Sequence, residues 1–135
     1  MPEPHEHHLR VRYAETDQMG VAYHANHLVW LEEGRTRMMD SLGLSYAELE
    51  REGIGLAVRR VELTYRAPAR FDEELVVRTR IDRMRPASIC FAYEIVREDD
   101  GKLLLEGTVE LACIDLSQPG MGLIALPEKV HAALG

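Results

Sequence analysis

The second half of this chain repeats one pattern four times: apolar residues alternate with polar ones over a run, and turn-forming residues separate the runs. Alternation with a period of two is typical of a β-strand that buries one face. The last break, Asp99-Asp100-Gly101, is a clear hairpin turn. The four predicted strands lie at 61–65, 75–81, 89–95 and 103–113. A chain built from successive strands of this kind is expected to fold around an antiparallel sheet with one apolar face.

The first half of the chain shows helical spacing over most of its length. A strand is predicted over 8–14, where apolar residues alternate with arginines, and a loop over 15–22 follows it. Apolar and long side chains then recur at spacings of three and four, which predicts a long helix over 26–42 that stops at Gly43. The predicted buried face of that helix consists of Leu28, Leu31, Arg35, Met38 and Leu42.

Two short helices are predicted, one on either side of the run of strands. Ser45 and Glu48 form the capping-box pattern of a helix start, so the first is expected over 46–51. The second is expected over 127–134, with a proline at its start. Helices gathered on one face of an antiparallel sheet make an α+β domain, and the chain length fits a single domain that spans 1–135.

A glycine, Gly34, lies inside the predicted long helix. Glycine in a helix interior costs about 1 kcal/mol relative to alanine. Its presence indicates either a close approach of the helix backbone to a packed neighbour or a neutral position on the surface.

Composition and charge argue against several classes of function. A formal net charge of -7 disfavours nucleic acid as a partner, because binding to phosphates needs clustered lysine and arginine. No apolar run approaches the roughly 20 residues of a transmembrane helix, and no signal-peptide core follows the polar N-terminus. We therefore expect a cytoplasmic protein without membrane insertion. The two cysteines, Cys90 and Cys113, lie in strand-like apolar runs and are expected to be reduced core thiols.

One segment, from Arg10 to His27, carries residues suited to acyl transfer. It contains the predicted strand, then Asp17 on a glycine-containing loop, then the start of the long helix. A helix start offers free backbone N–H groups and partial positive charge, which can stabilise negative charge on a carbonyl oxygen. A neighbouring carboxylate can attack an acyl carbon or activate a water. By position alone, however, an aspartate before a helix is more often a cap or a turn residue.

The same segment resembles the signature of the 4-hydroxybenzoyl-CoA thioesterase family, which includes the acyl-CoA thioesterases associated with the Tol-Pal system. Ala22 departs from that signature, since valine or threonine is usual there. The order of the predicted elements is similar to that of the family over nearly the whole chain. The residues that match the signature are Arg10, Val11, Thr16, Asp17, Gly20, Val21, Tyr23, His24 and Ala25.

The resemblance implies a hotdog fold, in which a long antiparallel sheet wraps around one central helix. It also implies subunits that pair their sheets, with active sites at the dimer interface, so we expect a homodimer at least and a homotetramer from the pairing of dimers. Asp17 is implied as the catalytic carboxylate, acting as nucleophile or general base on a short-chain or aromatic acyl-CoA. Backbone N–H groups near Tyr23 and His24 are implied to polarise the thioester carbonyl, without a metal or another cofactor.

The other candidate residues around Asp17 each have two interpretations. His24 could hydrogen-bond Asp17, the acyl group or a water as a second catalytic residue, or it could be a packed histidine near the helix start. Asn26 could touch the substrate, although helix capping is the favoured role. His24 and His27 lie three residues apart, but no further ligands at metal spacing accompany them. The substrate-binding candidates in this segment are completed by Gly20, Val21 and Tyr23.

The phosphates of CoA require an exposed basic patch. By resemblance, Arg83 and Arg85 are candidates together with Ser88, because they lie at a predicted strand connection. Two solvated charges at a turn are an equally good interpretation. A second basic stretch has the same ambiguity, and it consists of Arg59, Arg60, Arg66 and Arg70.

Two other functions fit the same fold. One is a non-catalytic hotdog protein that binds acyl-CoA, and the retained Asp17 argues against it. The other is a hotdog dehydratase that acts on acyl-carrier protein. Such dehydratases usually combine a catalytic histidine with a helix carboxylate in a different motif. The sequence therefore favours a thioester hydrolase.

Overall fold

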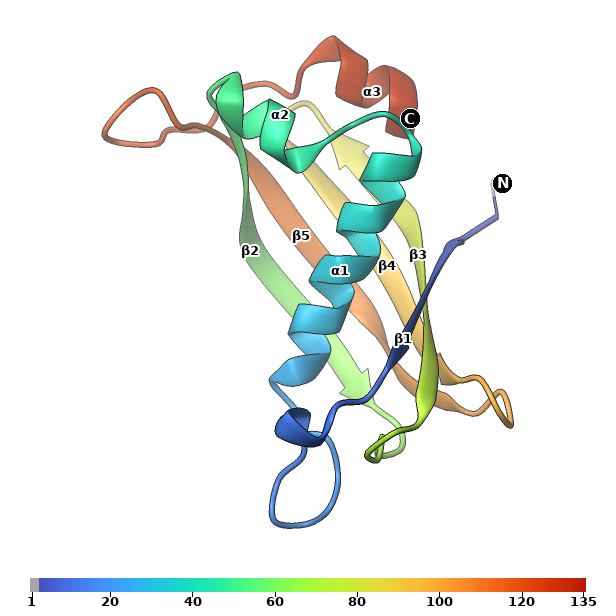
Figure 1. The fold of residues 1–135 in the computed structure, drawn as a ribbon. Coiled ribbons are helices and arrows are strands. Elements are labelled where there is room, and N and C mark those ends of the chain that lie inside the picture. Colours follow the sequence, from blue (N-terminus) through green and yellow to red (C-terminus); the bar gives the residue numbers. More distant parts are fainter. Residues whose placement is uncertain (1–2) are drawn as a thin grey trace.

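Five antiparallel strands form a single sheet that curves around one long helix in the computed structural model of the chain, which describes residues 3–135 (Figure 1). The strands are ordered β1-β3-β4-β5-β2, so β1 and β2 are the two edges of the sheet. The strand bounds are His5–Arg10 for β1, Ile54–Tyr65 for β2, Glu74–Arg85 for β3, Ser88–Arg97 for β4 and Leu103–Asp115 for β5. The helices are α1 (Asn26–Ser41), α2 (Tyr46–Arg51) and α3 (Glu128–Leu134), and one turn of 3-10 helix covers Tyr13–Glu15.

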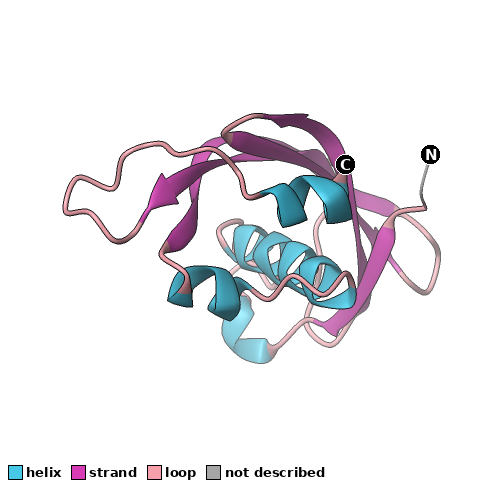
Figure 2. Ribbon diagram, turned by 90° about the horizontal axis from the view of Figure 1, so that it is seen from above, coloured by secondary structure: helices cyan, strands magenta, loops and turns pink. Residues whose placement is uncertain are grey.

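The sheet wraps around α1, which lies along its concave face, while α2 and α3 gather at one end of the sheet (Figures 1 and 2). The predicted α+β class, with a long sheet around a central helix, is confirmed. Within residues 3–135, no helix is both long enough and apolar enough to cross a membrane.

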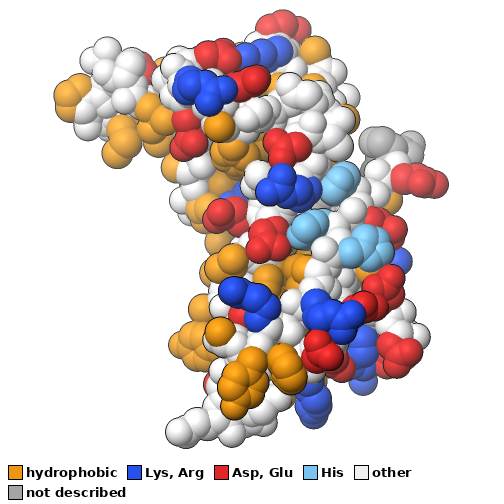
Figure 3. Space-filling model, viewed as in Figure 1, with side chains coloured by type: hydrophobic (Ala, Val, Ile, Leu, Met, Phe, Trp, Pro, Cys, Tyr) orange, Lys and Arg blue, Asp and Glu red, His pale blue; other side chains and the backbone are white. Residues whose placement is uncertain are grey.

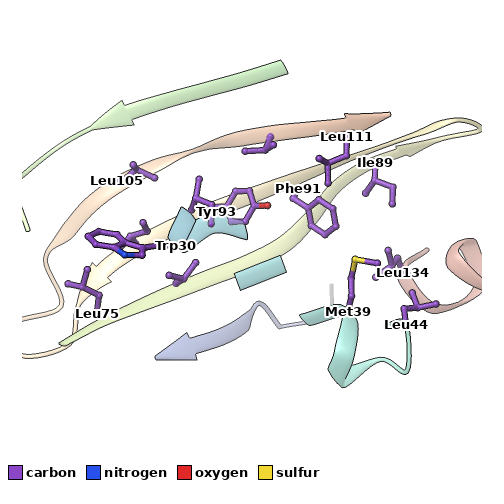
Figure 4. Packing of buried hydrophobic residues seen from close by; sticks show 14 of the residues in the cluster. Trp30, Met39, Leu44, Leu75, Ile89, Phe91, Tyr93, Leu105, Leu111 and Leu134 are labelled. Carbon is purple, nitrogen blue, oxygen red and sulfur yellow. The ribbon is translucent and has the colours of Figure 1, made fainter. Parts of the chain in front are cut away.

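The hydrophobic core fills the space between α1 and the sheet. Trp30 and Met39 project from α1, and Phe91 and Tyr93 meet them from β4, all with almost no exposed surface (Figure 4). Burying a large apolar side chain contributes about 1.5–3 kcal/mol each, so this layer is the main source of stability. Cys90 and Cys113 are both buried and free, as predicted.

Gly34 is a point of close approach between α1 and β3. A Cβ atom at this position would lie 2.8 Å from both Thr79 Oγ1 and Val77 Cγ1 of β3. The absence of a side chain therefore lets the helix backbone settle onto β3, and the interpretation as a close approach is correct.

The first strand differs from the prediction of 8–14. β1 starts earlier and ends at Arg10, and the chain then turns through the 3-10 helix. Tyr13, one of the apolar residues in the alternation that predicted this strand, is therefore 77% exposed. The physical reason is Glu15. Its carboxylate accepts the backbone N–H of Arg12 at 2.7 Å, which closes a tight turn that a continuing strand would not allow.

The buried face of α1 also differs from the predicted one. Leu31 and Arg35 are buried as expected, but Leu28 and Leu42 are 41% and 43% exposed. Relative to the predicted orientation, the helix is rotated about its axis so that His27 and Trp30 face the core instead. The buried residues of α1 are His27, Trp30, Leu31, Gly34, Arg35 and Met39. Strand β2 is longer than predicted as well, since it starts at Ile54.

Candidate active site

Asp17 lies on a tight turn that its own carboxylate stabilises. The backbone N–H of Asp17 donates to the Val21 carbonyl at 2.9 Å, and the Gly20 N–H donates to the Asp17 carbonyl at 3.0 Å. Gly20 has φ of +79°, in the left-handed region that favours glycine, which explains this residue in the motif. Carboxylate oxygen Oδ1 accepts the Met19 N–H at 2.8 Å, whereas Oδ2 has no hydrogen-bond donor within residues 3–135.

The strand-like end of this turn is anchored to the segment that leads into β3. Ala22 donates its N–H to the Ala69 carbonyl at 2.8 Å, and Val21 forms an isolated antiparallel bridge with Arg70. Thr16 and Ala22 form a second bridge across the base of the turn. Backbone hydrogen bonds therefore fix Asp17 from both sides, as a catalytic group requires.

Glu15 joins the Asp17 turn to the start of α1. Its carbonyl accepts two hydrogen bonds at 2.8 Å, one from the Tyr23 N–H and one from the Asn26 side-chain amide. Its carboxylate, in a residue that is 6% exposed, accepts the indole N–H of Trp30 at 2.9 Å in addition to the Arg12 N–H. No signal in the sequence indicated this role of Glu15, because the residue lies at a variable position of the motif, between Val11 and Thr16.

The start of α1 has unsatisfied backbone donors. The N-cap residue is Ala25, which has no side-chain cap, so the expected capping role of Asn26 is wrong. Within residues 3–135, neither the His24 N–H nor the Ala25 N–H meets an acceptor, while the Tyr23 N–H is occupied by Glu15. Free N–H groups at the positive end of a helix of sixteen residues can stabilise a developing oxyanion.

Asp17 lies in the wall between two hollows. One, of about 400 Å³, also contains His24 and Tyr65 and has the apolar side chains of Met19, Val21 and Pro68 in its lining. The other, of about 680 Å³, lies on the opposite side of the turn. Its lining includes Tyr13 and Phe71, whose rings meet edge to face at 5.5 Å. The carboxylate is therefore accessible to a ligand that has both polar and apolar parts.

Next to this site, His27 is buried at the first turn of α1. Its Nδ1 lies 3.2 Å from the His24 carbonyl oxygen, so this nitrogen carries the proton and donates. Burial is the largest influence on the imidazole and lowers its pKa, although the neighbouring carbonyls act in the opposite direction. A neutral His27 therefore supports the helix start.

The structure brings one group of predicted site residues together and leaves the other group apart. Around Asp17 lie Gly20, Val21, Tyr23, His24 and Asn26. Arg83, Arg85 and Ser88 lie at the hairpin between β3 and β4, at the other end of the sheet. The twelve residues of β3 span the distance between the two ends, and eleven steps of about 3.2 Å along this twisted strand give roughly 35 Å. Ser88 is buried, while both arginines are exposed.

Comparison with known proteins gives the family. The family model described as the thioesterase-like superfamily matches residues 11–134. The chain belongs to this family. The prediction of a thioesterase-type hydrolase with a hotdog fold is thereby confirmed.

Several relatives cover nearly the whole chain. It is 37% identical over 124 residues to the acyl-CoA thioester hydrolase YbgC of Escherichia coli, an alignment that covers 92% of this chain and 90% of that protein. Among solved structures, it is similar to the hypothetical protein TT1821 from Thermus thermophilus, with 40% identity, a TM-score of 0.87 and coverage of 96% and 95%. It is also similar to DHNA-CoA thioesterase from Staphylococcus aureus, with 33% identity, a TM-score of 0.89 and coverage of 95% and 86%.

Proposed function

We propose that this chain hydrolyses acyl-CoA thioesters and that Asp17 is the catalytic carboxylate. The observation that carries the proposal is the pairing of two groups. One is a carboxylate with one oxygen held by the Met19 N–H and the other without a donor. The other is the start of α1, where the N–H groups of His24 and Ala25 lack acceptors within the described residues. The similarity to the acyl-CoA thioester hydrolase YbgC supports acyl-CoA as the substrate.

The mechanism begins with polarisation of the thioester carbonyl by the helix start. Asp17 then acts in one of two ways. As a nucleophile it attacks the acyl carbon, expels CoA as the thiolate and forms an acyl anhydride, which water cleaves to the free acid and the carboxylate. As a general base it takes a proton from a water that attacks the same carbon, after which the C–S bond breaks and the proton passes to the departing CoA thiolate. In both routes the developing oxyanion accepts hydrogen bonds from the backbone N–H groups at the start of α1. The exposed His24 ring contacts the water or the acyl group.

The proposed site lies at a dimer interface formed along β2. This strand is one edge of the sheet formed by residues 3–135, and within those residues no other strand pairs with its outer side. It exposes Val58, Val61 and Tyr65, and hydrophobic surface gathers along this flank of the molecule (Figure 3). The other edge, β1, is half as long and reads His-Glu-His-His-Leu-Arg, a polar sequence. Two copies related by a twofold axis through β2 would make an isologous dimer, and two dimers the tetramer.

Antiparallel pairing at β2 also gives Arg83 and Arg85 a role. It places the β3–β4 hairpin of one copy near the Asp17 end of the other, so the arginines reach CoA phosphates across the interface while Ser88 supports the hairpin. In this arrangement the roughly 35 Å between the two groups within one copy is no obstacle. A single domain of residues 1–135, acting in the cytoplasm without a bound cofactor, completes the proposal.

The acyl group is proposed to be short or aromatic. The hollow of about 400 Å³ beside Asp17 suits a small acyl group, and its lining is mainly apolar. The resemblance of the motif to 4-hydroxybenzoyl-CoA thioesterases favours the aromatic choice, as does the similarity to DHNA-CoA thioesterase.

The test is an Asp17→Asn variant assayed for thiol release on a panel of acetyl-, hexanoyl-, benzoyl- and palmitoyl-CoA. We expect wild-type turnover to be fastest on the short or aromatic substrates and the variant to be slower by a hundredfold or more, about the contribution of a general base. Asp82→Asn, an exposed aspartate of β3, is the matched control. Near-normal turnover by Asp17→Asn would remove Asp17 from the mechanism. Absence of thiol release from every substrate by the wild type would favour a non-catalytic binding protein.

A further inference from the structure

The peptide group between His24 and Ala25 is held by two side chains from outside the Asp17 turn. The Tyr65 hydroxyl, at the end of β2, donates to the His24 carbonyl at 2.7 Å. Nδ1 of His27 donates to the same oxygen at 3.2 Å. One carbonyl oxygen therefore accepts two side-chain hydrogen bonds from residues that lie three and 41 positions along the chain.

The geometry of a peptide group links this carbonyl to the catalytic end of the helix. The His24 C=O and the Ala25 N–H belong to one planar trans unit, because the chain has no cis peptide bond among its described residues. The two groups point in opposite directions, so fixing the carbonyl fixes the N–H. Hydrogen bonds accepted by a carbonyl also polarise the peptide and strengthen its N–H as a donor.

The two donors are themselves firmly placed. Their rings pack against each other, with centroids 5.0 Å apart and planes at 76°. His27 also packs on Trp30 at 4.6 Å, and Tyr65 is paired with Leu105 of β5. The His24 carbonyl is therefore tied to both α1 and the sheet, which is what pre-organisation of an oxyanion donor requires.

We propose that Tyr65 and His27 are positioning residues for thioester hydrolysis, which orient and polarise the Ala25 N–H so that it receives the negative charge on the thioester oxygen. The inference rests on the proposed function of Asp17 and extends it to residues outside the motif. Neither side chain needs to touch the reacting atoms. Their contribution is to the transition state, where charge develops on the oxygen, so they should affect kcat more than KM.

Tyr65→Phe removes one donor and keeps the ring. We expect kcat to fall about tenfold, the effect of one hydrogen bond, with KM within about twofold of the wild type. His27→Asn keeps an N–H donor at the equivalent position and should retain most of the activity, whereas His27→Leu should behave like Tyr65→Phe. Tyr46→Phe, the same change on α2 at the other end of α1, is the matched control and should leave both constants unchanged.

A spectroscopic measurement on the same variants separates positioning from general loss of structure. The ¹³C resonance of the His24 carbonyl should move upfield in Tyr65→Phe, because a carbonyl that loses a hydrogen bond is less deshielded, and should stay in place in Tyr46→Phe. An unchanged kcat in Tyr65→Phe, with Asp17→Asn inactive, would overturn this inference and leave the proposed function intact. A raised KM with unchanged kcat would make Tyr65 a substrate contact and overturn it equally. Full turnover by Asp17→Asn would instead overturn the proposed function, and this inference with it.

Discussion

Replacing Glu15 by glutamine should destabilise the protein and loosen the turn that carries Asp17. The two carboxylate oxygens of Glu15 accept two N–H groups, one from the Arg12 backbone and one from the Trp30 indole. Glutamine has nearly the same shape but only one oxygen. Its amide NH₂ group must therefore face one of the two donors, in a residue that is almost fully buried.

The magnitude follows from these contacts. A hydrogen bond to a charged group contributes about 1.5–3 kcal/mol, and a buried donor left without an acceptor costs a similar amount. One of the two bonds survives in Glu15→Gln, so the free energy of unfolding should fall by about 2–3 kcal/mol. With a urea m-value of about 2 kcal/mol per molar for a domain of this size, the unfolding midpoint should decrease by about 1–1.5 M.

The assay uses the single tryptophan of the chain. Because Trp30 itself donates to Glu15, its fluorescence reports both the global unfolding and the local contact. Glu33→Gln is the matched control. Glu33 is exposed and pairs with His7 at 3.1 Å, and a surface pair of this kind contributes 0–1 kcal/mol. Equal urea midpoints for Glu15→Gln and Glu33→Gln, with unchanged tryptophan emission, would refute the assignment of Glu15 as the support of the turn.

Three further predictions concern packing, pH and assembly. Gly34→Ala should lower the thermal midpoint, because the new methyl group would lie 2.8 Å from Thr79 Oγ1. The cost of this overpacking, about 1–3 kcal/mol, outweighs a helix-propensity gain of about 1 kcal/mol. A higher midpoint measured by calorimetry would contradict this prediction. Burial lowers the pKa of His27 in the folded state below its ordinary 6.5, so the unfolded state binds the proton first as the pH decreases. At pH values below about 6.5 the free energy of unfolding should therefore decrease, by up to about 1.4 kcal/mol per pH unit. Urea titrations at several pH values should show a shallower decline in His27→Asn, and parallel declines would exclude His27 as the cause. Refolding equal amounts of Asp17→Asn and Arg83→Ala together should restore about a quarter of the wild-type activity at low acyl-CoA concentration. Half of the dimers then contain one copy of each variant, and one of the two sites in such a mixed dimer is intact. Activity equal to the mean of the separate variants would rule out a site shared between copies.

The order of elements was predictable because its signals are local. The alternation in β3, β4 and β5, the cap at Ser45 and the turn before Gly101 each depend on a few neighbouring residues. The structure follows all of them, including the Ser45 side chain that accepts the Glu48 N–H. The 3-10 turn that ends β1 was not predictable in the same way. It depends on a carboxylate that is stabilised by Trp30, fifteen residues further along the chain.

The candidate site likewise has a part that local sequence signals predict and a part that depends on distant residues. Asp17, Gly20 and the helix start lie within one segment, so the motif could indicate them together. The groups that hold this segment in place come from elsewhere: the Ala69 carbonyl before β3 and the Tyr65 hydroxyl at the end of β2. No spacing in the sequence connects Tyr65 with His24, because their contact exists only after β2 has joined the sheet next to α1.

The wrong helix face has a physical explanation that bears on assembly. Hydrophobic periodicity counts every apolar residue as core, whether the partner surface belongs to the same chain or to another copy. Leu28 lies one turn after His24, whose carbonyl meets Tyr65 at the β2 edge, and it is exposed together with Val29. A leucine that satisfies the helical pattern but remains exposed in one copy is what the proposed pairing of two copies would require if this end of α1 also contacts the partner. The wrongly predicted face of α1 is therefore consistent with the proposed interface, and the mixed-dimer experiment tests that interface directly.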